Sequence, residues 1–470
     1  MTQFSDIEEP LREVTERFYE FETEHSLFQV RIDGVAVWEL IRFDVHRQIL
    51  RELDLIGKAH SDESPSNLEA LRRIGRNLVT KNPFGPKDVD VALFGHERRK
   101  EDAEGLWWDI YCDPITASAE WDHVHLEQPY LGSHRSPAKS ERLRYVDLLK
   151  YTGGALTKVT PERVTSSSTE TRSFERAEQA IERSFDISVD VTGLATSALH
   201  SRAIRLPLWR SLLRRLDPDL CFVVVSYWRT TFVEACRKEG IPVAELQHGV
   251  IYPEHVGYSY PDGVGEAVPD YLLTFGPFWN DAASYPIPEE NVRSVGFPYL
   301  ERQLPDDPSG TSDDAVVFLS QGTVGRDLSK VAVTLAESLG DREMVFKLHP
   351  GETDRWRSVH PWLVDSPVRV VDGEDIRLYD LFERAGVQVG VNSTALYEGL
   401  AFGLETYVLP FSGVAAMRRL VEAGGATLVA DADELSSELR STTHAHGLPE
   451  EVFESDAAEN IERFVNEVIG

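Results

Sequence analysis

Short apolar runs that alternate with helical stretches constrain the fold of this chain more than any other feature. A first set of runs lies at residues 89–95, 122–128, 220–226, 242–249, 271–276 and 292–296. A second set lies at residues 315–320, 344–349, 368–372, 387–391, 406–410 and 426–430. Alternation of this kind is typical of βαβ units that build a parallel sheet. The sequence therefore predicts an α/β fold with two Rossmann-like domains that face a cleft, with ligands beyond the carboxyl ends of the strands.

A segment rich in Pro, Asp, Ser and Gly at residues 302–314 separates the two sets, and 470 residues are too many for one ordinary core. We expect a mainly helical N-terminal extension, two Rossmann-like domains and a C-terminal helix. Their predicted bounds are residues 1–88, 89–300, 311–440 and 441–470. The extension and the last helix should support the first domain, and the polar segment 164–173 should be a surface loop.

Acidic residues outnumber basic ones by 79 to 48, which gives a net charge of -31 spread along the whole chain. A field of this sign repels nucleic acid and anionic lipid, so we exclude nucleic acid as a partner. An acid-rich surface whose cations are mostly arginine suits a halophilic protein, because concentrated salt screens the self-repulsion.

The sequence also predicts where the protein works. Cys112, Cys221 and Cys236 form no CxxC pair, and the first residues lack the basic start and apolar run of a signal peptide. No run approaches ~20 uninterrupted apolar residues. We therefore expect a cytoplasmic protein without a membrane span, and peripheral membrane association through a partner stays open.

Metal ligands are not evident in the sequence. DxD triplets begin at Asp88, Asp217 and Asp431, but chance produces such triplets in a chain this acidic. His123 and His125 alternate along one predicted strand and share a face, with no third ligand in sight. We therefore predict no metal and no resident cofactor.

The most informative stretch is residues 387–410, in which a predicted strand is followed by Asn392, Ser393 and Thr394 at the start of a helix. Free backbone N–H groups and the helix dipole make such a start suitable for the phosphate of a nucleotide. Glu398 lies one turn further on and could accept from ribose hydroxyls. The alternative is ordinary helix capping by Ser or Thr, although the glutamate does not have the spacing of a capping box.

Three further residues of the second half are candidates for binding the donor. His349 follows a predicted strand within Lys-Leu-His-Pro-Gly-Glu, where it could contact the base or the leaving phosphate. Gly322 lies in a glycine-bearing turn that would let the backbone approach a phosphate, and Arg326 could neutralise that phosphate. A structural histidine and an ordinary turn are the alternatives.

The first half offers a candidate base and acceptor contacts. His248 ends a predicted strand before a glycine, where it could take a proton from an acceptor hydroxyl, with Gln247 to orient it. The alternative is a histidine bonded to a backbone carbonyl in a turn. Trp108 could stack on a sugar face and Arg98 could line the acceptor site, although packing is the commoner role of a tryptophan.

The order of these motifs resembles that of GT-B-fold transferases. It runs Gln-His-Gly at 247–249, Gly-Phe-Pro at 296–298, Lys-Leu-His-Pro at 347–350 and Asn-Ser-Thr at 392–394, followed by Glu398. Over about residues 220 to 410 the chain is similar to capsule-polysaccharide enzymes, CDP-glycerol glycerophosphotransferases and bacterial sialyl- and polysialyltransferases. The resemblance implies that His248 supplies the base, that His349 contacts the nucleotide, and that Ser393 and Thr394 bind its phosphate.

We therefore expect a metal-independent glycosyltransferase-type enzyme of surface polysaccharide or glycoprotein biosynthesis. The first domain would hold a glycan or lipid-linked acceptor, and the second a donor activated by CMP, CDP or UDP. Two alternatives stay open. One is a sugar-nucleotide epimerase of the UDP-N-acetylglucosamine 2-epimerase type, which needs no acceptor, and the other is a non-catalytic transferase-like subunit.

Overall fold

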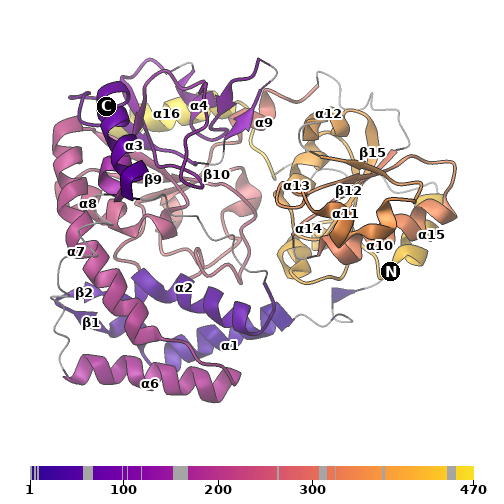
Figure 1. Ribbon diagram of the computed structural model, residues 1–470, viewed down its shortest axis with the longest axis horizontal. Coiled ribbons are helices and arrows are strands. Elements are labelled where there is room, and N and C mark those ends of the chain that lie inside the picture. Colours follow the sequence, from indigo (N-terminus) through magenta and orange to yellow (C-terminus); the bar gives the residue numbers. More distant parts are fainter. Residues whose placement is uncertain are drawn as a thin grey trace.

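The computed structural model divides the chain into two α/β domains with additional helices beside the first (Figure 1). Its described residues are 3, 4, 7, 10–56, 67–97, 99–102, 104–117, 119–151, 168–261, 264–305, 315–322, 324–372, 376–441 and 451–470. Most of the predicted linker, residues 306–314, therefore lies outside the described residues. Among the described residues, no helix is both long and apolar enough to cross a bilayer.

Seven strands form the sheet of the first domain, in the order β11-β10-β9-β8-β3-β6-β7. Every neighbouring pair is parallel. The strands are β3 (Val91–Phe94), β6 (His123–Glu127), β7 (Leu143–Tyr145), β8 (Leu220–Val224), β9 (Val243–Leu246), β10 (Tyr271–Thr274) and β11 (Val292–Ser294). The first set of apolar runs therefore forms this sheet, to which the structure adds the edge strand β7.

Six strands form the sheet of the second domain, in the order β14-β13-β12-β15-β16-β17, and every pair is again parallel. The strands are β12 (Ala315–Leu319), β13 (Met344–Lys347), β14 (Arg369–Val371), β15 (Ala385–Gly390), β16 (Glu405–Val408) and β17 (Thr427–Leu428). All six coincide with the second set of apolar runs. The two sheets confirm the predicted fold class, two Rossmann-like domains in a GT-B-like arrangement with N-terminal helices.

The central strands are buried along their whole length because helices cover both faces of each sheet. On one face of the first sheet, Phe94 packs against Trp209 and Phe232 from the covering helices. On the other face, Phe222 contacts Phe464. The first domain has the helices α3 (Asn67–Thr80), α4 (Asp113–Thr116), α7 (Val191–Leu216), α8 (Thr230–Glu239), α9 (Pro298–Glu301) and α16 (Ala457–Ile469).

The second domain is covered by helices that alternate with its strands (Figure 1). They are α10 (Gly325–Ser338), α11 (Trp356–Val359), α12 (Leu378–Phe382), α13 (Thr394–Ala401), α14 (Arg418–Glu422) and α15 (Ala432–Arg440). Two short hairpins, β1 (Arg31–Ile32) with β2 (Val35–Ala36) and β4 (Lys100–Glu101) with β5 (Trp107–Trp108), lie outside the two sheets.

The N-terminal extension forms its own apolar cluster with two later helices. Helices α1 (Pro10–Glu24) and α2 (Val37–Glu52) pack with α6 (Ser168–Phe185) and with α7. Inside this cluster Arg42 Nε lies 2.7 Å from Glu22 Oε1, a buried ion pair. The expectation of a surface loop at 164–173 was wrong for residues 168–173, which begin α6, and residues 164–167 lie outside the described residues.

Helix α16 returns to the first domain although it follows the second domain in the sequence. Its apolar face, including Ile461, Phe464 and Val465, belongs to the core on one side of the first sheet. The segment that leads into it is held by backbone hydrogen bonds, such as Glu454 N to Phe275 O at 2.7 Å. The chain therefore passes from the first domain to the second and back again.

Aromatic and charged side chains hold the two domains against each other. Trp279 of the first domain lies 4.7 Å from the ring of Tyr397 in α13 of the second domain. Arg419 in α14 pairs with Asp281 at 2.5 Å. Trp279 and Asp281 follow the carboxyl end of β10, so the loop after this strand contacts α13 and α14 of the second domain.

Candidate active site

Both sheets have a topological switch point, where the strand order reverses and neighbouring loops diverge. In the first sheet the switch lies between β3 and β8, and in the second between β12 and β15. In open α/β sheets ligands bind beyond the carboxyl ends of strands at such points, because the diverging loops leave room. In the second domain the residues after these strands are 320–322 and 391–394, which include the predicted Gly322, Ser393 and Thr394.

The switch point of the second domain is fixed by one pair of amide side chains. Gln321 Oε1 accepts from the backbone N–H of Asn392 at 3.1 Å, and Gln321 Nε2 donates to Asn392 Oδ1. The amide of Asn392 packs on Gly413, where φ is +92° and a Cβ would lie 2.0 Å from Asn392 Nδ2. Gly322, by contrast, has no atom of the described residues, its chain neighbours aside, within 4 Å of its Cβ position. The backbone at Gly322 is therefore open to a ligand.

Helix α13 begins at this point and is directed towards the first domain. Ser393 is its N-cap, and its Oγ accepts from Ala395 N at 3.2 Å, so the capping role considered from the sequence is present. Thr394 Oγ1 lies 3.4 Å from the Cβ position of Gly249, the residue after His248. The start of α13 and the loop after β9 are therefore in contact across the domain boundary.

A chain of hydrogen bonds links His248 to a buried carboxylate. His248 Nδ1 lies 3.0 Å from the Tyr258 hydroxyl, which donates to Glu245 Oε1 at 2.9 Å. Glu245 also accepts from Ser226 N at 3.1 Å and Ser226 Oγ at 2.5 Å. The hydroxyl of Tyr258 has one proton, and a carboxylate is the stronger acceptor, so His248 donates from Nδ1. Nε2 is then the basic nitrogen, 3.4 Å from the hydroxyl of Tyr227.

Burial controls the protonation of this chain. It raises the pKa of Glu245, while the hydrogen bonds from Ser226 and Tyr258 lower it. Burial also raises the pKa of Tyr258 well above its usual value, so its hydroxyl keeps its proton. An imidazole whose Nδ1–H is fixed in this way has the orientation and tautomer that a general base needs.

Glu352 joins the turns that contain His349 and the start of α10. Its Oε2 accepts from the backbone N–H of His349 at 2.9 Å and from Ser320 Oγ at 2.6 Å. At Gly325, the first residue of α10, a Cβ would lie 2.4 Å from Glu352 Oε1. The side chain of His349 is exposed, and so is that of Arg326, whose guanidinium lies 5.5 Å from the ring of Trp362. The sequence analysis did not identify Glu352.

Glu398 and Trp108 belong to a second contact between the domains. Glu398 is only 6% exposed, and its Oε2 accepts from the Tyr379 hydroxyl at 2.8 Å. The Tyr379 ring lies 5.8 Å from that of Tyr299, which in turn lies 5.8 Å from Trp108. The indole of Trp108 donates to Asp102 at 2.6 Å. These residues form a boundary layer distinct from the contact between Gly249 and Thr394.

Gln247 and Arg98 are the two remaining residues predicted to bind the acceptor. Gln247 is buried, with its Nε2 donating to Gly249 O at 2.9 Å and its Oε1 accepting from Phe275 N at 2.7 Å. It therefore joins the loop of His248 to the backbone that follows β10. Arg98 lies outside the described residues.

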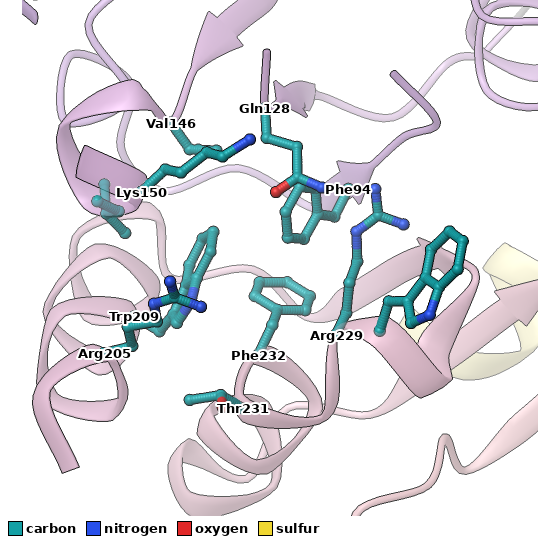
Figure 2. A pocket seen from close by; sticks show the side chains of 11 residues that line it. Phe94, Gln128, Val146, Lys150, Arg205, Trp209, Arg229, Thr231 and Phe232 are labelled. Atoms are coloured by element: carbon teal, nitrogen blue, oxygen red, sulfur yellow. The ribbon is translucent and has the colours of Figure 1, made fainter. Parts of the chain in front are cut away.

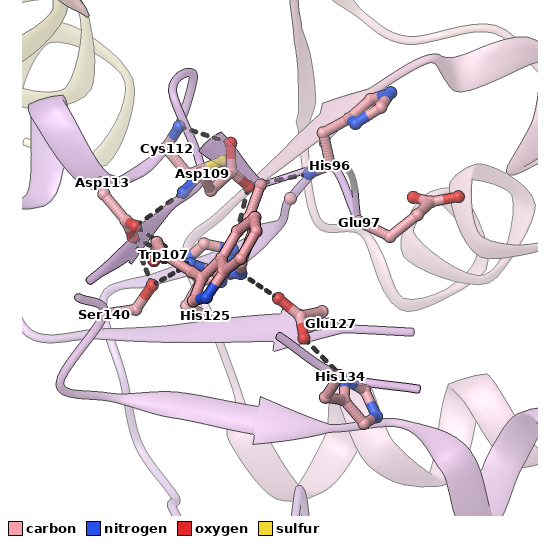
Figure 3. A network of polar contacts seen from close by, with 12 residues as sticks. His96, Glu97, Trp107, Asp109, Cys112, Asp113, His125, Glu127, His134 and Ser140 are labelled. Carbon is pink, nitrogen blue, oxygen red and sulfur yellow. Dashed lines mark hydrogen bonds and ion pairs between the residues drawn. The ribbon is translucent and has the colours of Figure 1, made fainter. Parts of the chain in front are cut away.

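Seven alternating acidic and basic side chains form a continuous series of contacts in the first domain, and Figure 3 shows the part around His125 and Glu127. His125 Nε2 lies 3.2 Å from Asp109, and its Nδ1 lies 3.2 Å from Asp113. Arg99 pairs with Asp113 at 3.1 Å and also with Glu127. His134 lies 2.6 Å from Glu127 and 2.6 Å from Asp147. In order, the series is Asp109, His125, Asp113, Arg99, Glu127, His134 and Asp147.

Atoms of Asp109, Cys112 and His125 lie within 4.8 Å of one another, all of them buried, and are the residues that could hold a metal. The two carboxylates beside His125 raise its pKa to about 9, against the effect of burial, so the ring is protonated at neutral pH. A protonated imidazole has no lone pair for a metal. Burial and the nearby carboxylates also raise the pKa of Cys112, which keeps the thiol neutral. These contacts form an ion-pair network around a protonated His125.

Comparisons with known proteins give similarity only at the level of solved structures. No protein-family model matches the chain, and no curated protein matches its sequence. The chain is similar to UDP-GlcNAc 2-epimerase from Methanocaldococcus jannaschii in complex with UDP-GlcNAc and UDP, at 13% identity over 80% of this chain and 99% of that chain, with a TM-score of 0.48.

Two transferases are similar over a comparable length. The glycotransferase of kitacinnamycin is 13% identical over 82% of this chain and 95% of its own, with a TM-score of 0.42. The wall teichoic acid polymerase TagF is 9% identical over 86% and 98%, with a TM-score of 0.42. The function of the chain has to be argued from its own residues.

Proposed function

We propose that this protein transfers a group from a nucleotide-activated donor to the hydroxyl of a glycan or lipid-linked acceptor. The observation that supports the proposal is the contact between Gly249 and Thr394, which brings the loop of His248 to the start of α13. A base and a phosphate-binding helix start on opposite sides of one boundary are what a direct displacement requires. The sugar or polyol phosphate to be transferred, and the CMP, CDP or UDP carrier, belong to the same proposal.

In the proposed reaction, His248 Nε2 takes the proton of the acceptor hydroxyl while the hydroxyl oxygen bonds to the donor's activated centre. The bond from that centre to the nucleotide phosphate breaks, and the phosphate keeps the electron pair. The backbone N–H groups at the start of α13, with the hydroxyls of Ser393 and Thr394, would stabilise the new charge on the phosphate. Arg326 and His349 are exposed near the second switch point and would contact the nucleotide.

A thermal-shift screen with CMP, CDP, UDP and GDP at high salt tests nucleotide binding first, because a ligand that binds only the folded state raises the melting temperature. We expect one of these nucleotides to do so, and Thr394→Val to reduce that shift. His248→Ala should keep the shift and lose transfer to the acceptor. No shift with any of the four nucleotides would refute the proposal.

Turnover of the sugar nucleotide, measured with and without an acceptor, separates the two alternatives. An epimerase would convert the sugar nucleotide with no acceptor present, whereas a transferase would consume it only with one. A non-catalytic subunit would bind a nucleotide or glycan and would be indifferent to His248→Ala.

A further inference from the structure

A small pocket of about 80 Å³ lies at the carboxyl end of the first sheet and is not used by the proposed reaction (Figure 2). Its walls come from the ends of β3, β6 and β8 and from α7 and α8, so it lies beside the switch point between β3 and β8. Pockets for whole small molecules are commonly about 300–1,000 Å³. This one has room only for a single small chemical group.

Three cationic side chains, Lys150, Arg205 and Arg229, line the pocket, and no acidic side chain of the described residues does. In Figure 2, Lys150 and Arg205 reach in from one side and Arg229 from the other. Such a cluster is notable in a chain with a net charge of -31. A concave site lined by charges of one sign attracts ligands that carry the opposite charge.

Arg229 is a structural member of the pocket, and the other two cations are not. Its guanidinium donates to Gly95 O at 2.8 Å and pairs with Glu97 at 3.0 Å. Among the described residues, Lys150 and Arg205 have no carboxylate within ion-pair distance. Lys150 Nζ donates only to Pro129 O, at 3.3 Å. Arg205 Nε is buried with no hydrogen-bond partner among the described residues.

The surroundings make the charge of Arg205 costly unless an anion neutralises it. Burial lowers the pKa of Arg205, and no carboxylate acts in the opposite direction. The rings of Trp209 and Phe232 form the apolar wall between the cations (Figure 2). Charges beside apolar walls interact more strongly with a bound counter-ion than charges in water do.

Two aromatic rings link the pocket to the proposed catalytic histidine. Trp228, which lines the pocket and is 55% exposed, lies 5.6 Å from the ring of Tyr227. Tyr227 lies 6.1 Å from the ring of His248. A molecule whose anionic group occupies the pocket could therefore cover Trp228 and extend towards His248.

We propose that this pocket binds the phosphate group of the acceptor, so that the enzyme acts on a phosphorylated glycan or a phosphate-bearing lipid. The identification of the ligand as the acceptor rests on the proposed function. The prediction that the pocket binds a phosphate group does not. Arginine and lysine from two different elements suit a tetrahedral phosphate, which accepts from several directions. Arg229, held in place by Gly95 and Glu97, supplies a fixed cation on the opposite side of the site.

Binding of three probes, measured by calorimetry at about 0.1 M salt, tests the proposal. The probes are inorganic phosphate, glucose 1-phosphate and geranyl phosphate, whose relative affinities distinguish a free anion, a phosphorylated glycan and a phosphate-bearing lipid. The double variant Lys150→Gln with Arg205→Gln should bind the best probe about a hundredfold more weakly, because each of the two lost charged hydrogen bonds costs about a factor of ten. Arg205→Lys should retain most of the affinity.

The matched control removes two exposed cations elsewhere, Lys87→Gln with Arg369→Gln, and changes the net charge by the same amount. If both double variants lost the same affinity for the probe, the loss would be due to the overall charge, and the proposed site would be refuted. Failure of all three probes to bind the parent protein would also refute it. Nucleotide binding is measured separately, so a nucleotide-induced melting shift without phosphate binding would leave the proposed function standing and overturn only the acceptor inference.

Discussion

The His125 ion pairs make a specific prediction for the stability of the first domain as a function of pH. His125 has a model-peptide pKa of 6.5 and a folded-state pKa of about 9, because Asp109 and Asp113 stabilise its charged form. A raised histidine pKa contributes stability that is complete below pH 6.5 and is lost as the pH rises through about 9. The difference between the two values corresponds to about 3 kcal/mol.

The perturbation is His125→Gln, compared with the parent by urea unfolding between about pH 6 and about pH 10. The destabilisation caused by the substitution should be largest at the acidic end and shrink by about 3 kcal/mol towards the alkaline end, because the parent loses its ion pair there. The control is His123→Gln on the same strand. Burial lowers the pKa of His123, so the effect of its substitution should change only at the acidic end, in the opposite direction, and stay constant between about pH 8 and about pH 10.

A penalty for His125→Gln that is the same at both ends of the range would refute the reasoning. It would mean that the imidazole is neutral in the folded protein at neutral pH, and the argument against a metal at Asp109, Cys112 and His125 would fail with it. Elemental analysis of the purified protein would then be the decisive measurement.

Three further predictions follow from the same structure. Tyr258→Phe should lower kcat/KM about ten- to hundredfold, because His248 loses the acceptor of its Nδ1 proton. The nucleotide-induced melting shift should be retained, and an unchanged kcat/KM would contradict the role given to Tyr258. Gly95→Ala should destabilise the folded protein by about 1–3 kcal/mol, because the added Cβ would lie 2.0 Å from Asp109 Oδ2. Gly75→Ala, in an open helical position, should stabilise the folded protein by about 0.5–1 kcal/mol. Similar unfolding midpoints for the two variants would contradict this prediction. The melting temperature should rise with NaCl up to about 1 M, because salt screens a net charge of -31, and a fall would argue against salt adaptation.

The strands of both sheets could be predicted because a strand buried on both faces is a short apolar run with turn residues at its ends. Leu220–Val224 and Ala315–Leu319 are examples. The edge strand β7 was missed because Leu143 is the only fully buried residue among its three. The start of α6 is hard to predict because a helix that covers an apolar cluster keeps a polar outer face, and such a polar segment has the composition of a loop.

The candidate site could be predicted only in part. His248, Ser393 and Thr394 follow strands directly, so the fold class alone places them at a carboxyl edge. Tyr258 and Glu352 could not be found in this way, because they reach the site from loops with no periodic pattern. Nor does the sequence show that β3 and β6 pair, which is what brings His125 to the loop carrying Asp109.

The return of α16 to the first sheet sets an order of events during synthesis. The core on one side of that sheet stays incomplete until residues 461–465 arrive, which the ribosome makes only after every strand of the second domain. The second sheet has all of its strands between Ala315 and Leu428 and can close first. In this molecule the domain that begins earlier therefore matures later, and the exposed faces of Phe222 and Leu273 must be protected from aggregation in the interval.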